Sequence, residues 1–264
     1  MLPLVLFFCS CRKNDVCEPV IKPAGNLIRI QQGVDPDISK DTVHLISYES
    51  PGRIKMVVDS ARKDTMYAIY DGSGRLSRIR QMHDFSYSPL NRTGDSVRLS
   101  YNTDGSLATY DYSKAGSQFQ CAFEYAGGVL AKSSFYTSDF NSGPLTLWRT
   151  FIYEMSGGNM VGRKEYTASN SLVEETKFTY GPQANPFKSI ALFNFANQLG
   201  TQEVIDLELY FNQNILTGYT NPMRSLNNTN SFNASQKPDK IVSRFVYPNG
   251  TKFNYVFTRF FSYD

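Results

Sequence analysis

The fold of this chain is decided by two short stretches, Tyr70-Asp-Gly-Ser-Gly74-Arg-Leu76 and Tyr101-Asn-Thr-Asp-Gly105-Ser-Leu107. Both place a glycine four residues after a tyrosine and a leucine two residues after that glycine. A loop rich in Asn, Asp and Ser that closes on glycine is typical of a hairpin turn, because glycine adopts positive φ at no steric cost. The spacing therefore predicts a β-hairpin at each stretch.

The same unit recurs along most of the chain, with one residue more or fewer in some copies. The other copies are Tyr48–Ile54, Tyr125–Leu130 (one residue shorter), Tyr153–Met160 (one longer), Phe211–Leu216, Tyr247–Gly250 and a divergent copy that begins at Tyr180. Repetition at this period predicts about eight hairpins, hence about sixteen strands, in an antiparallel meander.

Apolar and polar residues alternate before the turns, as half-buried strands require. Phe119, Cys121 and Phe123 alternate with Gln120 and Glu124, for example, which predicts a ring-bearing face and a polar face. A sheet this wide curls, splits or closes. We therefore expect an all-β fold: a curled antiparallel meander, forming an open or partly closed up-and-down barrel with the aromatic face inside.

Two other all-β folds remain open. A two-layer β-sandwich also buries one face of each strand. An outer-membrane barrel also uses alternating strands and aromatic residues, although the chain closes on Ser262-Tyr263-Asp264. Two segments break the hairpin rhythm: residues 181–203 contain a candidate short helix, and residues 218–240 are predicted to form a loop.

Composition narrows the function classes. Aromatic residues make up 14% of the 264 residues, which excludes disorder throughout, and the abundance of Tyr, Phe, Thr, Ser and Gly disfavours a helical bundle. The net charge of +3, from 27 basic and 24 acidic residues, argues against nucleic acid as a partner.

The amino-terminal segment is typical of a targeting signal. Leu2–Phe8 is an apolar run too short for a bilayer, which needs about 20 helical residues. The following Cys9-Ser10-Cys11 resembles the acylation site of bacterial lipoproteins, with Cys11 as the lipidated residue. Phe8 and the lack of a preceding Lys or Arg depart from that pattern. We predict a lipoprotein-type signal at 1–11, a tether at 12–26 and one hairpin-repeat domain at 27–264.

Tyr70-Asp71-x-x-Gly74-Arg75-Leu76 resembles the YD-repeat signature of Rhs-type proteins, at longer spacing. Together with Asn185-Pro186-Phe187, Ser225-Leu226-Asn227-Asn228 and the candidate lipid anchor, the chain resembles uncharacterised Bacteroidetes envelope lipoproteins with such hairpins. That resemblance implies an extracytoplasmic β-protein, lipid-anchored to the outer membrane in an undetermined leaflet, and it transfers no catalytic residue.

Four Asp-Ser/Thr-aliphatic triplets resemble Bacteroidetes O-glycosylation sites. The acceptor residues would be Thr42, Ser60, Thr65 and Ser96. The alternative is that such pairs simply mark turns and strand starts.

The sequence contains no recognisable catalytic or metal-binding motif. His44 and His83 have no second ligand at metal spacing, so neither a metal nor a cofactor is predicted. Ser96 follows Gly94-Asp95, but it starts an alternating strand and not the strand-to-helix turn of a hydrolase nucleophile. Cys17 and Cys121 could pair, although Cys121 has the position of a small core residue.

The leading hypothesis is a monomeric, non-enzymatic binding protein whose partners are the membrane, through its lipid, and a glycan or an envelope protein. Four aromatic residues at or beside predicted loops are candidates to face a ligand: Trp148, Tyr136, Phe140 and Tyr219. The alternatives are an envelope glycan hydrolase that uses carboxylates and a purely structural spacer.

Overall fold

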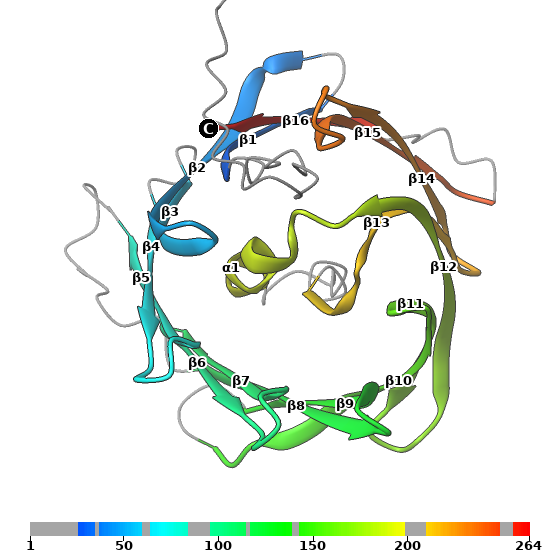
Figure 1. Cartoon of the computed structure of the whole chain (residues 1–264). Helices are drawn as coiled ribbons and strands as arrows, with labels where there is room; N and C mark the ends of the chain where they lie inside the picture. Colours follow the sequence, from blue (N-terminus) through cyan, green and yellow to red (C-terminus); the bar gives the residue numbers. More distant parts are fainter. Residues whose placement is uncertain are drawn as a thin grey trace, which may run out of the picture.

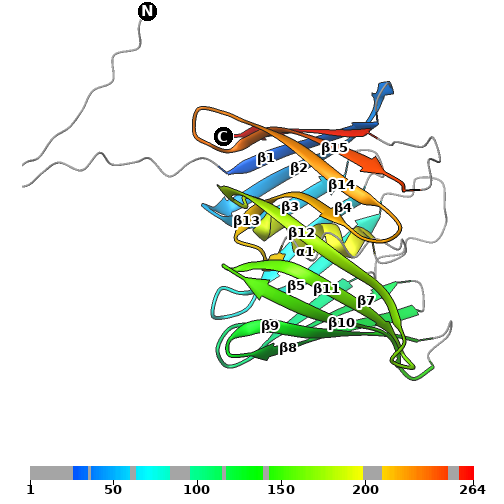
Figure 2. The same cartoon turned by 90° about the vertical axis from the view of Figure 1, so that its right-hand side faces the viewer.

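The structure is a computed structural model, and it shows a closed β-barrel with the helix α1 (Lys188–Gln198) inside (Figures 1 and 2). The described residues are 26–34, 37–59, 64–83, 96–114, 117–138, 143–198, 210–248 and 256–264. Cys11, Cys17 and the predicted signal and tether up to residue 25 lie outside them. Within the described ranges, no helix is both long and apolar enough to cross a bilayer.

Sixteen antiparallel strands are joined in chain order, and β1 pairs with β16 to close the barrel. The strands are β1 (Leu27–Val34), β2 (Asp37–Ser50), β3 (Arg53–Asp59), β4 (Asp64–Tyr70), β5 (Leu76–His83), β6 (Ser96–Tyr101), β7 (Leu107–Lys114), β8 (Ser117–Ala126), β9 (Val129–Thr137), β10 (Thr146–Ser156), β11 (Asn159–Thr167), β12 (Leu172–Ala184), β13 (Asn214–Thr220), β14 (Ser225–Phe232), β15 (Pro238–Val246) and β16 (Val256–Tyr263). The up-and-down barrel is confirmed, and its closure excludes the sandwich.

The repeated tyrosines form a ladder of hydrogen bonds between successive hairpins. Each donates its hydroxyl to the carbonyl of a residue that opens the second strand of the preceding hairpin, or β1 itself. The pairs are Tyr48–Leu27 (2.8 Å), Tyr70–Ile54 (2.7 Å), Tyr101–Leu76 (2.6 Å), Tyr125–Leu107 (2.8 Å), Tyr180–Met160 (2.7 Å) and Tyr263–Pro238 (2.9 Å). This tyrosine ladder gives the recurring tyrosine a structural role, whereas the residue at the leucine position contributes only its backbone carbonyl to it.

The turns of the repeats all lie at one end of the barrel, which we call the repeat end. Gly74 (φ 81°) and Gly105 (φ 85°) have the positive φ that their positions in the motif predict. The odd-numbered strands, such as β1 and β3, finish at the opposite end of the barrel, which we call the far end. Since β1 starts and β16 finishes at the repeat end, Asn26 and Asp264 meet there, and Asn26 donates its side-chain amide to Asp264 at 3.3 Å.

In two copies of the repeat, those at Tyr153 and Phe211, the structure places other residues in the predicted positions of the motif. Met155, and not Tyr153, lies opposite Met160 in the β10–β11 hairpin, and the Tyr153 hydroxyl is 2.6 Å from the hydroxyl of Ser133. Phe211 is helical, so Phe211–Leu216 is no separate hairpin; Tyr180 lies opposite Leu216, and the turn between them carries an insertion. That insertion contains α1 (Lys188–Gln198), the predicted short helix.

Two predictions are wrong: that residues 218–240 form a loop, and that a copy of the repeat begins at Tyr247. Residues 218–240 contain β14, whose Asn-rich sequence is held in a ladder between β13 and β15. The hairpin there places Phe232 opposite Pro238 and turns at Gln236 (φ 58°). Tyr247 follows β15 at the far end, and therefore does not belong to a repeat turn.

The barrel has an apolar interior, and its outer face carries both charged and apolar side chains. Buried inward-facing side chains such as Val57, Ile79 and Phe151 form one core, and α1 fills part of the lumen with its consecutive buried residues 190–193 (Figure 1). On the outer face, the exposed Arg78 pairs in register with the exposed Arg98. Exposed apolar residues, such as Leu45, Ile69 and Ile152, lie on the same outer face.

We predict that alkaline pH loosens the tyrosine ladder. Burial, with smaller effects of Asp264 and Tyr70, raises the pKa of Tyr48 to about 12, and burial raises the pKa of Tyr101 and Tyr125 as well. A folded-state pKa above the ordinary value of 10.0 stabilises the fold fully below pH 10, and this contribution is lost as the pH rises from 10 to 12. Urea unfolding at pH 8, 10 and 11.5, with phenolate absorbance at 295 nm, measures this loss. Ladder tyrosines that ionise near pH 10 in a fully folded chain would contradict it.

Candidate functional site

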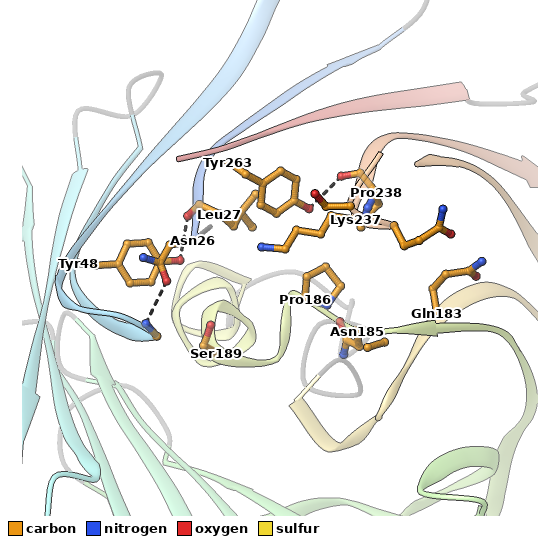
Figure 3. Close-up of a pocket in the computed structure, with 14 residues that line it drawn as sticks. Asn26, Leu27, Tyr48, Gln183, Asn185, Pro186, Ser189, Lys237, Pro238 and Tyr263 are labelled. Carbon is orange, nitrogen blue, oxygen red and sulfur yellow. Dashed lines mark hydrogen bonds between the residues drawn. The ribbon is translucent and has the colours of Figure 1, made fainter. Parts of the chain in front are cut away.

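The candidate site is a cavity of about 490 Å³ at the repeat end, which we call the mouth cavity. It lies between the start of α1 and the barrel wall formed by the ends of β1, β2, β12, β15 and β16 (Figure 3). Its lining residues are Asn26, Leu27, Tyr48, Gly52, Gln183, Ala184, Asn185, Pro186, Ser189, Ser235, Gln236, Lys237, Pro238 and Tyr263. The volume is within the range of small-molecule sites, about 300 to 1,000 Å³.

Hydrogen bonds hold the wall of the mouth cavity in place. Tyr48 and Tyr263 are fixed by the tyrosine ladder, and the side-chain oxygen of Asn26 accepts the backbone N–H of Gly52 at 3.0 Å. The Asn185 side chain accepts the backbone N–H of Phe187 at 2.9 Å, and this contact fixes the start of α1. The site is therefore largely preformed.

Several polar side chains on this wall are left to interact with a ligand. Gln183, Ser189, Ser235 and Gln236 line the cavity from three segments, and their amide and hydroxyl groups make no hydrogen bond with the described part of the chain. The ammonium of Lys237 lies 4.6 Å from the ring centroid of Tyr263, where desolvation lowers the lysine pKa although Asp264 opposes the change. The cavity thus offers neutral donors and acceptors, one cation and aromatic rings.

A second cavity of about 290 Å³ lies on the other side of the start of α1, and we call it the ladder cavity. Its lining residues are Gly52, Ile54, Tyr70, Arg75, Leu76, Tyr101, Gly105, Ser189, Leu192, Phe193 and Tyr210. Gly52 and Ser189 line both cavities, so the two adjoin.

Charged side chains also face the lumen between β10 and β12, toward the far end. Arg163 is buried, with a nitrogen 3.5 Å from a carboxylate oxygen of Glu174, and Arg149 lies 3.2 Å from Glu165. The Asn221 amide donates to Glu174 at 2.9 Å. Burial raises the pKa of Glu165 although Arg149 and Arg163 oppose it. The opposite charges of this lumen charge cluster lie close together inside the barrel, so we assign the cluster to stability.

The aromatic residues predicted to face a ligand are not brought together. Trp148 is exposed on β10, Tyr136 lies on the outer face opposite Gln120, and Tyr219 is buried against Phe178. Phe140 lies outside the described residues. Sequence reasoning did not predict the mouth cavity; the signal that could have found it is the break in the hairpin rhythm at Asn185-Pro186-Phe187.

The other predicted residues occupy varied places. Thr65 is half-buried on β4, Thr42 and Ser96 belong to β2 and β6, and Ser60 lies outside the described residues. Nothing in the structure tests their glycosylation, which stays a prediction. Cys121 is a buried free thiol whose pKa is raised by that burial. Among the described side chains, no group of three or more His, Cys, Asp or Glu could hold a metal ion.

Solved structures show where this fold occurs. A porin-like protein from Bacteroides uniformis aligns over 92% of this chain and 98% of its own, with a TM-score of 0.61 and 12% identity. A porin-like protein from Bacteroides vulgatus aligns over 91% and 99%, with a TM-score of 0.53 and 12% identity. The chain therefore has the fold of these porin-like barrels.

The other comparisons do not extend the similarity beyond this fold. The TcdB2-TccC3-TEV structure aligns over 82% of this chain but 10% of its own, at 15% identity and a TM-score of 0.30, which is too low to carry an argument about fold. No protein-family model matches the chain, and neither does any curated protein. The resemblance to YD repeats stays a prediction.

Proposed function

We propose that this protein is a non-enzymatic binding protein of the bacterial cell envelope, and that the mouth cavity holds a saccharide. The observation that carries the proposal is the preformed cavity with available amide and hydroxyl groups beside aromatic rings. Such groups form hydrogen bonds with sugar hydroxyls in both directions, and tyrosine rings offer apolar faces to the sugar ring.

A transmembrane pore fits these observations less well. Each Arg or Lys on the lipid face of a barrel costs about 2 to 4 kcal/mol near the middle of the bilayer. Here the outer face carries Arg78, Arg98, Lys164 and Lys177, with apolar residues such as Ile69 interspersed among them. The lumen is occupied by the core and by α1.

The carboxylate-based hydrolase is also less well supported. Glycoside hydrolysis uses two acids on opposite sides of the scissile bond. The described residues that line the mouth cavity include no Asp or Glu. The chemistry of this cavity favours binding over turnover.

The envelope location rests on the lipoprotein-like Cys11 and on the porin-like fold of the two Bacteroides structures. The first strand of the barrel, β1, begins at Leu27, at the repeat end. Cys11→Ala is expected to move the protein from the membrane fraction to the soluble fraction of lysed cells. Membrane association that is unchanged in this variant would contradict the anchor.

Binding is tested by isothermal titration with the methyl glycosides of glucose, galactose and N-acetylglucosamine. We expect at least one to bind, and the double variant Gln183→Ala/Gln236→Ala to weaken that binding about tenfold or more, because each hydrogen bond contributes roughly 0.5 to 1.5 kcal/mol. Gln120→Ala is the matched control, since Gln120 faces outward from β8. Equal affinity in the two variants, or no binding by any glycoside, argues against the proposed site.

A further inference from the structure

The two cavities at the repeat end differ in chemistry. The mouth cavity presents amide, hydroxyl and ammonium groups, whereas the floor of the ladder cavity is apolar, formed by Ile54, Leu76, Leu192 and Phe193. Tyr70, Tyr101, Tyr210 and Arg75 also line the ladder cavity. One cavity suits a polyhydroxylated group and the other an apolar ring.

The tyrosine ladder accounts for this difference. Tyr70 and Tyr101 already donate their hydroxyls to the carbonyls of Ile54 and Leu76, at 2.7 and 2.6 Å. Their hydroxyl donors are therefore not available to a ligand, and what these residues offer is mostly ring surface. Burial raises the pKa of both phenols, which keeps them neutral and leaves the cavity without phenolate charge.

The volume of the ladder cavity and its junction with the mouth cavity are both consistent with an apolar ring as its occupant. An apolar cavity of about 150 Å³ already holds a benzene ring, and the ladder cavity has about 290 Å³. The two cavities meet at Ser189, which is exposed on the first turn of α1, and at Gly52, where even an added Cβ would meet no atom within 4 Å. The two cavities are therefore contiguous along these two residues, with open space beside Gly52.

We propose that the ligand is amphipathic: a saccharide in the mouth cavity that carries an aromatic or other apolar substituent, which enters the ladder cavity past Ser189. This inference rests on the proposed function, because it extends the ligand of the mouth cavity. It adds the second binding region and the chemical class of the group that occupies it.

The test compares two probes with the same sugar, a methyl glycoside and the corresponding 4-nitrophenyl glycoside, with 4-nitrophenol alone as a third. The 4-nitrophenyl glycoside is expected to bind at least tenfold more tightly than the methyl glycoside. Ser189→Trp closes the junction, so the 4-nitrophenyl glycoside should bind this variant no more tightly than the methyl glycoside does. Ala168→Trp adds the same bulk to the exposed β11–β12 turn at the far end and should change neither affinity. Melting curves confirm that both variants are folded.

The outcomes separate the two proposals. Equal affinities for the methyl and 4-nitrophenyl glycosides overturn the amphipathic ligand and leave saccharide binding intact. A gain that persists in Ser189→Trp shows that the aryl group lies elsewhere, and also overturns it. If no glycoside binds, or if 4-nitrophenol alone binds as tightly as its glycoside, the saccharide site itself is wrong.

Discussion

Arg163→Met is expected to lower the free energy of unfolding by about 3 kcal/mol, because breaking a buried ion pair leaves an uncompensated charge. Arg163 faces the lumen at 8% exposure, with its guanidinium 5.3 Å from the ring centroid of Phe151 and 5.9 Å from that of Phe178. Methionine restores much of the apolar volume, so the loss measures the charge more than the packing. Glu174, 3.5 Å from Arg163, is left inside the barrel without this cation.

The double variant Arg163→Met/Glu174→Gln is the matched control. Glutamine removes the unpaired negative charge, and its side-chain oxygen still accepts from Asn221, so stability should return to within about 1 kcal/mol of the wild-type value. Urea unfolding of both variants measures the difference. A single variant no less stable than the double variant would mean that Arg163 and Glu174 are not energetically coupled.

Tyr110→Ala is expected to be the most destabilising change near the site, at about 4 kcal/mol. Tyr110 is among the largest fully buried side chains, and its hydroxyl donates to the Leu192 carbonyl of α1 at 3.0 Å. Alanine removes the ring that packs against the helix and leaves that carbonyl without this donor. Tyr110→Phe keeps the ring, so it should cost only about 1 to 2 kcal/mol.

The same pair of variants links stability to binding. Because α1 contributes Ser189 to both cavities, loosening the helix in Tyr110→Ala should weaken glycoside binding and speed hydrogen exchange of the α1 amides. Tyr110→Phe should stay close to the wild type in both measurements. Slow exchange of the α1 amides in Tyr110→Ala would show that other contacts suffice to hold the helix.

The all-β class, the inward face of the strands and the glycine turns could be read from local pattern. Alternation at period 2 assigns Phe123 and Glu124 to opposite faces without knowledge of any partner strand. A glycine with positive φ, such as Gly105, marks its turn equally locally. Errors arose where the motif was assigned from sequence alone, without the pairing of the strands. Tyr153 and Phe211 resemble the tyrosine of the motif, but strand pairing places Met155 opposite Met160 and Tyr180 opposite Leu216.

The residues of the candidate site were mostly not predicted. Asn26, Gln183, Ser189 and Lys237 come from four separate segments, and no spacing in the chain relates them. They meet because β1 pairs with β16 and because the insertion between β12 and β13 folds back into the lumen as α1 (Figures 1 and 3). Closure of the ring is a long-range event, and its outcome depends on shape and packing around the whole barrel.

Local chemistry thus specified most of the strands and turns and the side of each such strand that would be buried, since these depend on a few neighbouring residues. The Asn-rich β14, by contrast, is a strand because it pairs with β13 and β15. The three-dimensional arrangement alone decided that the sheet closes, that a helix occupies its lumen and that two cavities adjoin at Ser189. These features depend on contacts between residues far apart in the chain, whose free energies no short segment encodes.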